Sequence, residues 1–226
     1  MKKLLILSIL AVGVIAGCKK KDSLVSQVVT VSYPTVTITS GQYFSFPVGG
    51  GPLPSANTIT ATAYDSFYRQ SLPVVVDAST LTNLSPGLYI ATVSAKNKYG
   101  FVGYNYVYVA ITNVSDSMDL SGLYWRAGVA GGNDSANPAN VYKLARGLYM
   151  TDNVGGVDTG TQKSSVIPAV FAVTSLSTLD FGTQMTKEGI LTASPSSLNM
   201  IVADTTLDYA INLSGFGSQL RTFVKK

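Results

Sequence analysis

The side chains that most often carry chemistry are scarce in this sequence. It contains no histidine, one cysteine (Cys18) and one glutamate (Glu188). The absence of histidine excludes the Ser-His-Asp and Cys-His arrangements of hydrolases and the imidazole ligands of most zinc sites. No glycine-rich phosphate-binding pattern occurs either. The sequence therefore predicts a protein that is not an enzyme and that needs no cofactor.

Aspartate is the remaining candidate for acid–base or metal chemistry. Asp152 and Asp158 flank a short glycine-containing stretch, and Asp134 lies in the polar segment GGNDSANPAN. Two carboxyl groups suffice for glycoside hydrolysis, but aspartates in polar turns usually bond their own backbone. Calcium is the metal that such loops would suit, although neither loop has the spacing of an EF-hand. We expect Asp134, Asp152 and Asp158 to be turn residues and retain them as calcium candidates.

The first 22 residues have the features of a secretion signal with a lipid-attachment site. Lys2 and Lys3 precede a fourteen-residue uncharged run, 4–17, which is shorter than the roughly twenty residues of a membrane span. The sequence Ile15-Ala16-Gly17-Cys18 resembles the lipobox of bacterial lipoproteins. That resemblance implies a signal peptide at 1–17, acylation of Cys18 and a lipidated tether at 18–24, so that the membrane is a partner. The alternative is an ordinary signal peptide with a chance cysteine.

The net charge of +4 lies in the N-terminal segment. Residues 1–22 hold five lysines and one aspartate, whereas residues 23–226 hold eleven basic and eleven acidic side chains. Because nucleic-acid binding requires a clustered basic face, we expect no nucleic-acid partner. Charged residues make up only 12% of the chain, where about a quarter is usual. Such a surface suits neutral, hydroxyl-rich ligands.

Short segments rich in Val, Thr, Ile, Tyr and Phe alternate with Gly, Pro, Ser and Asn clusters, which is the pattern of many short strands. The sequence therefore predicts an all-β protein with two tandem antiparallel β domains, 25–114 and 115–226, divided at the polar stretch NVSDSMDLS. The expected strands are Gln27–Ser32, Gln42–Val48, Thr58–Tyr64, Gly87–Ala95, Phe101–Thr112, Val166–Thr174, Leu198–Val202, Leu207–Leu213 and Gln219–Val224.

The first domain carries the most specific fold signal. Gly87-x-Tyr89-x-Ala91 is similar to the G-x-Y-x-C motif of immunoglobulin-like domains, with alanine in place of the cysteine. The following AKNKYG resembles the hairpin turn into the last strand of cadherin-like and PKD-like modules. The resemblance implies a β-sandwich in which the Tyr89 hydroxyl bonds back to the backbone a few residues upstream.

The second domain begins with SGLYWRAG, which resembles the first strand of lipocalin-like barrels. In that family an arginine of the last strand covers the tryptophan, which would assign this role to Arg221 over Trp125. The sequence is equally compatible with a β-sandwich. We therefore keep two alternatives for this domain, a β-sandwich and a partly open lipocalin-like barrel.

Aromatic side chains are the candidate ligand-binding residues. In the segment YGFVGYNYVYVAITN, strand alternation places Tyr104, Tyr106 and Tyr108 on the face opposite the apolar row of Val107 and Val109. The tyrosine row is interpreted as a structural feature, either a cross-strand aromatic ladder or a face covered by the neighbouring domain. The alternatives are a stacking platform for sugars and a protein-binding surface. The full candidate set is Trp125, Tyr142, Tyr149, Tyr104, Tyr106 and Tyr108.

The C-terminal stretch TLDYAINLSGFGSQLRTFVKK is similar to the ends of Bacteroidota lipoproteins encoded beside glycan-uptake systems. That resemblance implies an outer-membrane lipoprotein, on the cell surface or on the periplasmic side. The expected function is non-enzymatic binding or presentation of polysaccharide, with outer-membrane glycan-uptake proteins as further partners. The alternative is a structural or adhesive module with an immunoglobulin-like spacer and a protein-binding C-terminal domain.

Overall fold

The computed structural model describes residues 31–226 apart from 83–84, 129–133, 201–204 and 215–216. Cys18, the predicted signal peptide and the tether lie outside the described residues. The same holds for most of the expected strand Gln27–Ser32 and for the last two residues of the expected strand Leu198–Val202. Tyr33–Lys226 form one compact unit. No helix in the described part of the chain combines the length and the apolar character that a membrane crossing requires.

All regular elements of the described residues are strands apart from short 3₁₀ helices, so the predicted all-β class is confirmed. The 3₁₀ helices are η1 (Ser79–Thr82), η2 (Asp134–Ala136) and η3 (Lys163–Ser165). The chain passes from the first two sheets to the third between Thr112 and Gly122. This passage lies in the polar stretch that was expected to divide the chain. The domain limits 25–114 and 115–226 stay a prediction.

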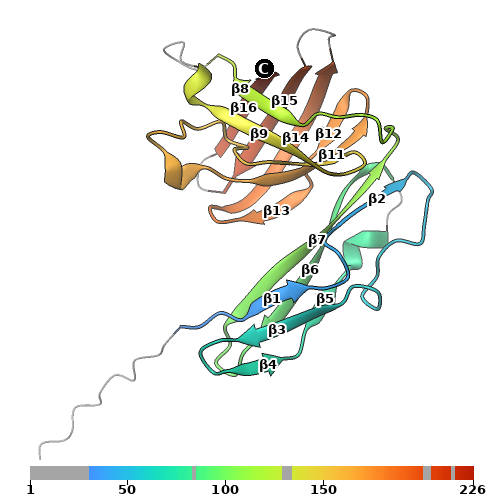
Figure 1. Cartoon of the computed structure of the whole chain (residues 1–226), viewed down its shortest axis with the longest axis vertical. Helices are drawn as coiled ribbons and strands as arrows, with labels where there is room; N and C mark the ends of the chain where they lie inside the picture. The colour runs from blue at the N-terminus through green and yellow to red at the C-terminus, as the bar shows by residue number, and fades with distance from the viewer. Residues whose placement is uncertain (1–30, 83–84, 129–133, 201–204, 215–216) are drawn as a thin grey trace, which may run out of the picture. The chain divides into compact units, whose positions relative to one another are not determined.

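The first set of strands forms two small sheets (Figure 1). One has the order β1-β3-β4 and the other has the order β2-β7-β6-β5. One pair departs from the expected antiparallel arrangement, because β2 leaves the sheet of β1 and joins β7 in parallel. The strands are β1 (Thr35–Ile38), β2 (Tyr43–Pro47), β3 (Ala61–Asp65), β4 (Gln70–Leu72), β5 (Val75–Asp77), β6 (Gly87–Lys96) and β7 (Val102–Thr112).

The core between these sheets contains the row predicted from β7. Val107, Val109 and Ile111 are fully buried in one hydrophobic cluster with Ala91. Ala91 lies directly opposite Val107 across the β6–β7 ladder. The Tyr89 hydroxyl donates a hydrogen bond to the Ser85 carbonyl at 2.9 Å. The expected tyrosine corner is therefore confirmed, and Tyr89 is a structural residue.

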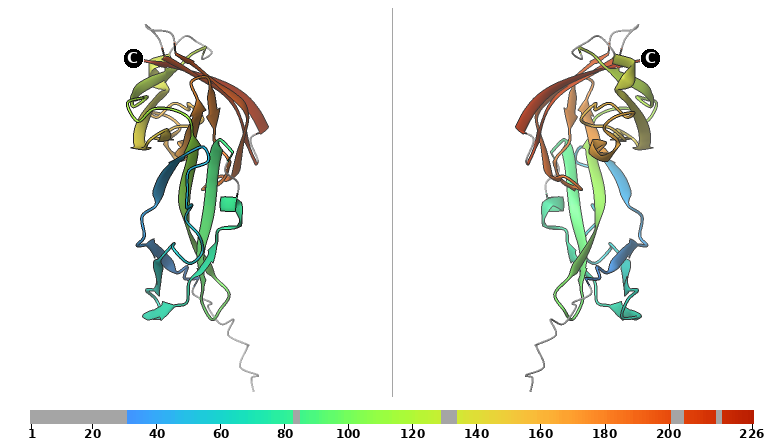
Figure 2. Two further views of the ribbon diagram at one scale, coloured as in Figure 1. Left: turned by 90° about the vertical axis from the view of Figure 1, so that its right-hand side faces the viewer. Right: turned by 90° about the vertical axis from the view of Figure 1, so that its left-hand side faces the viewer.

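The remaining strands form one curled sheet (Figure 2). Its order is β12-β11-β10-β9-β8-β16-β15-β14-β13. An additional pairing joins the end strand β12 to β14, which is next to the other end strand, β13. This closure favours the barrel-like alternative over a second sandwich. The strands are β8 (Gly122–Arg126), β9 (Pro138–Ala145), β10 (Leu148–Thr151), β11 (Ala169–Ser175), β12 (Thr178–Asp180), β13 (Thr183–Thr186), β14 (Gly189–Met200), β15 (Thr205–Leu213) and β16 (Gly217–Lys225).

A chain of aromatic rings fills the inside of the curled sheet. Consecutive ring centroids lie 4.8–5.7 Å apart, within the usual range for aromatic pairs. All five rings are almost completely buried, and they belong to one hydrophobic cluster. The rings are, in order of contact, Tyr149, Phe171, Phe181, Tyr209 and Phe223.

The outer face of the same sheet packs on β6 and β7. Because successive strand residues alternate between faces, Leu148, Val170 and Ala172 point away from the aromatic interior. They form a third hydrophobic cluster with Leu88 and Ala110. The two sets of strands therefore share a packed junction within the unit Tyr33–Lys226.

The expected cover of Trp125 by Arg221 is wrong. Trp125 lies opposite Val224 across the β8–β16 ladder, whereas Arg221 is three residues earlier and therefore on the other face. Arg221 points to the inside, where Phe223 is buried. Lys226 takes the place near the indole, with its Nζ 4.9 Å from the centroid of the Trp125 ring.

Candidate functional site: a tyrosine-lined groove

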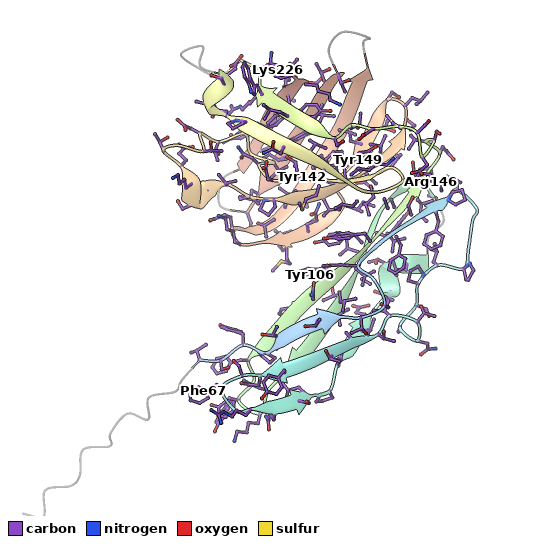
Figure 3. All side chains as sticks on the ribbon, in the orientation of Figure 1. Phe67, Tyr106, Tyr142, Arg146, Tyr149 and Lys226 are labelled. Atoms are coloured by element: carbon purple, nitrogen blue, oxygen red, sulfur yellow. The ribbon has the colours of Figure 1, made fainter. Side chains whose placement is uncertain are left out.

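The predicted tyrosine row runs along β7 from solvent into the junction. Tyr104 is 58% exposed, whereas Tyr106 and Tyr108 are half-buried. Tyr108 packs against the cluster that joins β6 and β7 to the curled sheet. The row is therefore partly covered by other protein and partly open. Tyr106 is labelled in Figure 3.

The open part of the row lines a groove of about 700 Å³. One wall carries tyrosines from β7, from β2 and from the segment before β1. The opposite wall comes from β10, β11 and β13 of the curled sheet, with Met150, Val170 and Met185. Lys187 is the one charged side chain among the described lining residues. The tyrosine lining is Tyr33, Tyr43, Tyr104, Tyr106 and Tyr108.

Strand pairing brings these tyrosines together. The parallel β2–β7 ladder places Tyr43 opposite Tyr108, and their rings are nearly parallel with centroids 5.9 Å apart. The Tyr106 ring follows at 6.4 Å from Tyr108 with a tilt of 55°. Tyr43, Tyr106 and Tyr108 therefore form one aromatic cluster along this wall of the groove.

A glycine allows the segment before β1 to lie against β7. A Cβ on Gly103 would stand 1.9 Å from the Pro34 carbonyl oxygen, so no larger residue fits without moving the backbone. Pro34 follows Tyr33, which lines the groove and packs edge-on against Phe101 with ring centroids 5.6 Å apart. Gly103 therefore helps to place Tyr33 at the groove.

Apart from Lys187, the polar side chains described along the groove are uncharged. Burial, together with the neighbouring Tyr43 and Tyr106, raises the pKa of Tyr108 to about 12. Burial and Tyr104 also raise the pKa of Tyr106. Both phenols therefore stay protonated at physiological pH, where each can donate and accept one hydrogen bond. Gln42, which also lines the groove, donates from its Nε2 to Asn105 Oδ1 at 3.0 Å.

The other predicted aromatic residues do not line this groove. Tyr149 is fully buried and its hydroxyl donates to the Met118 carbonyl at 2.7 Å, so it is a core residue without a ring face for a ligand. Tyr142 on β9 is 46% exposed, and Trp125 on β8 is half-buried next to Lys226. Tyr142, Tyr149 and Lys226 are labelled in Figure 3.

Sequence reasoning missed the residues that complete the groove. Tyr43 lies in the expected strand Gln42–Val48, so its place on a strand was predicted, but its approach to Tyr108 was not. Tyr33 precedes β1 outside any expected strand, and Met185 lies on β13, which was not expected. Their approach to β7 depends on sheet pairing and on the junction, for which no local signal exists.

Two of the three calcium candidates, Asp152 and Asp158, accept hydrogen bonds from other residues of the chain. Asp152 accepts hydrogen bonds from the backbone N–H and the side-chain amide of Asn140 at 2.8 and 2.7 Å. Asp158 accepts from the N–H groups of Gly160 and Thr161 at 2.7 and 3.2 Å. These bonds lower the pKa of Asp158. Asp134 lies in η2, and the described residues contain no cluster of three or more His, Cys, Asp or Glu side chains.

Comparisons with known proteins leave the family open. No protein-family model matches the chain, and no curated protein matches it. Among solved structures, the lipoprotein BT2262 from Bacteroides thetaiotaomicron matches 85% of this chain and 100% of its own length, with 14% sequence identity and a TM-score of 0.33. A TM-score this low does not establish a common fold, so the function rests on the residues themselves.

Proposed function

We propose that this protein is a lipid-anchored, non-enzymatic protein of the cell envelope that binds or presents polysaccharide at the outer membrane. The tyrosine-lined groove is the sugar-binding site in this proposal. The observation that carries it is that the Tyr104–Tyr108 row lines an open groove together with Tyr33 and Tyr43.

Sugar rings suit this groove for physical reasons. The C–H faces of a pyranose pack on aromatic rings, and its hydroxyls bond to phenols and amides that need no charge. The volume of about 700 Å³ lies in the range of known ligand sites. A protein partner would instead favour a flat, continuous apolar patch, whereas the tyrosines here follow the wall of a groove.

The anchor in this proposal is the acylated Cys18. The apolar run 4–17 and the cysteine directly after it support lipidation. Labelling with radioactive palmitate in a bacterial host tests it, and we expect the wild-type protein to incorporate label and Cys18→Ser to incorporate none. Equal labelling of both proteins would contradict the anchor without affecting the groove.

Affinity gel electrophoresis with neutral polysaccharides tests the sugar site. We expect the full-length protein to be retarded by at least one neutral glycan, and Tyr104→Ala to weaken the affinity about fivefold, because one exposed stacking contact is worth roughly 1 kcal/mol. Tyr64→Ala is the matched control, since Tyr64 is similarly exposed on β3 and does not line the groove.

Two results would count against the sugar site. One is the absence of retardation by every neutral polysaccharide tested, which would favour the structural or adhesive alternative. The other is an equal effect of Tyr104→Ala and Tyr64→Ala, which would place binding elsewhere on the protein.

A further inference from the structure

A second cavity, of about 460 Å³, lies inside the curled sheet. Its lining comes from β8, β15 and β16 and from the segment 154–167. Five aliphatic side chains form its apolar wall. Val157 is partly exposed, whereas Val154, Ile167, Ile211 and Leu213 are buried. The same cavity is lined by Arg126 and Arg221.

The two arginines are held in place by neutral acceptors. The buried Arg221, 9% exposed, donates from Nε to the Gly155 carbonyl at 2.6 Å and from Nη1 to its neighbour's carbonyl, that of Leu220, at 3.0 Å. Its Nη2 donates to Gln219 Oε1. Arg126 donates from Nη1 to the Gly156 carbonyl at 3.1 Å. Since each guanidinium carries five N–H donors, both retain donors for a further acceptor.

No carboxylate balances these charges among the described residues. The one ion pair that they form joins Lys143 to Asp116, 3.3 Å apart, and involves neither arginine. Burial and the nearby charge of Arg126 lower the pKa of Arg221. Burying a cation without an anionic partner costs free energy. A negatively charged ligand that pairs with the arginines would offset this cost and so bind more tightly.

The backbone carbonyls of Gly155 and Gly156 accept the hydrogen bonds from Arg221 and Arg126, and this segment requires a glycine at position 156. Gly156 has a φ of +55°, and a Cβ there would lie 2.6 Å from Arg126 Cδ and 2.8 Å from Phe223 Cζ. Only glycine permits this close approach with a left-handed backbone. The contact positions the Gly156 carbonyl against the Arg126 guanidinium and holds that side chain at the cavity.

We infer that this cavity binds the carboxylate of a small amphipathic acid, with the head on Arg126 and Arg221 and the apolar body on the aliphatic wall. Guanidinium groups match a carboxylate in planar geometry, and the volume is that of a small-molecule site. An uncharged ligand would leave the arginines unbalanced, and an inorganic anion would leave the aliphatic wall unused. The site is separate from the tyrosine-lined groove and does not depend on polysaccharide binding.

Isothermal titration calorimetry with hexanoate tests the inference on the full-length protein. We expect saturable binding of hexanoate, and at least tenfold weaker binding of hexanol, which lacks the charge, and of sulfate, which lacks the apolar body. Arg126→Gln should weaken hexanoate binding at least tenfold. Arg126→Lys should weaken it by a smaller factor, because lysine keeps the positive charge but lacks the planar guanidinium that can bind a carboxylate with two hydrogen bonds. Arg146→Gln is the matched control, since Arg146 lies between β9 and β10 and does not line the cavity (Figure 3).

Circular dichroism checks that each variant folds. Should Arg126→Gln fail to fold, the comparison of hexanoate with hexanol on the wild-type protein and the Arg126→Lys titration decide the matter. The inference is overturned if hexanoate does not bind, if hexanol binds as tightly, or if Arg126→Gln and Arg146→Gln behave alike. Tighter binding of glucuronate than of hexanoate would overturn the inference that the ligand has an apolar body, and it would assign the site to acidic sugars.

Discussion

At the scale of single residues, tyrosine has two opposite roles in this protein. Tyr124, Tyr149 and Tyr209 are buried, and each hydroxyl donates to a backbone carbonyl at 2.7–3.0 Å. Tyr104 and Tyr106 instead line the groove. The phenol allows both roles because its ring is apolar and its hydroxyl needs one partner, which is either backbone or water.

Asp180 is the residue whose replacement tests the junction. Its Oδ2 accepts a hydrogen bond from the Leu88 N–H, and its Oδ1 accepts one from the Gly182 N–H, both at 2.8 Å. We expect Asp180→Ala to lower the free energy of unfolding by roughly 1.5–3 kcal/mol, because hydrogen bonds to charged groups contribute about that much. Urea denaturation measures the change. Asp208→Ala, on the outer face of β15, should cost less than about 0.5 kcal/mol; equal losses would contradict a role for the Asp180 bonds.

At the scale of elements, the curled sheet uses its two faces for different purposes. The alternation of side chains along β11 sends Phe171 and Val173 into the aromatic interior and Val170 and Ala172 to the junction with β6 and β7. Both faces of β11 are apolar, and both are buried, one in the aromatic interior and the other in the junction. The same logic separates Arg221, inside, from Trp125, outside.

Phe181 is the residue that best tests the aromatic interior, because its ring contacts both Phe171 and Tyr209, at centroid distances of 5.2 and 4.8 Å. We expect Phe181→Ala to lower the free energy of unfolding by about 3–5 kcal/mol, as for other buried Phe→Ala changes. The control is Phe67→Ala, at an exposed position (Figure 3). A loss below 1 kcal/mol for Phe181→Ala in urea denaturation would show that the interior repacks easily.

At the scale of the whole molecule, stability depends on burial more than on charge. The residues from 23 onward carry equal numbers of acidic and basic groups, and the single ion pair of the described residues has an Asp116 side chain that is 78% exposed. Exposed pairs of this kind contribute little. We therefore expect ionic strength and mild acid to have small effects on folding, and the buried tyrosines to set the response to alkali.

Burial raises the pKa of Tyr124, Tyr149 and Tyr209, that of Tyr149 to about 12. The unfolded chain ionises near pH 10, so the stability from these protonated phenols is complete below pH 10. It is lost as the pH rises toward the folded-state pKa values, because the unfolded state releases protons first. Between pH 10 and its folded-state pKa, we expect each of these tyrosines to lower the free energy of unfolding by about 1.4 kcal/mol per pH unit.

Urea denaturation across pH 7–12, combined with tyrosinate absorbance, measures this response. The absorbance of the three buried phenols should rise together with the loss of structure. Ionisation of all tyrosines near pH 10 in a protein that stays folded would contradict the burial argument.

Much of the fold could be predicted because local patterns carry it. The strands expected at Gly87–Ala95, Phe101–Thr112 and Leu207–Leu213 correspond closely to β6, β7 and β15. Their alternation of apolar and polar residues is strong and long. β1, β4, β5, β10, β12 and β13 were missed, because strands of three or four residues are too short for a clear alternation. The longer β9 was missed because Lys143 and adjacent polar residues interrupt its apolar signal. The parallel β2–β7 pair was also missed, since pairing direction has no local sequence signal.

The sequence by itself determined the all-β class, the inward row of β7 and the scarcity of catalytic side chains, because each depends on composition or on a short period along one strand. The tyrosine corner at Tyr89 was implied by the resemblance of Gly87-x-Tyr89-x-Ala91 to the motif of immunoglobulin-like domains. Only the tertiary structure decided which tyrosines are core and which line a groove. It also decided that Arg126 and Arg221 meet in one cavity, with no carboxylate among the described residues that line it. Those outcomes depend on which strands become neighbours in space. Strand order follows from the packing of the whole chain, which no single segment encodes.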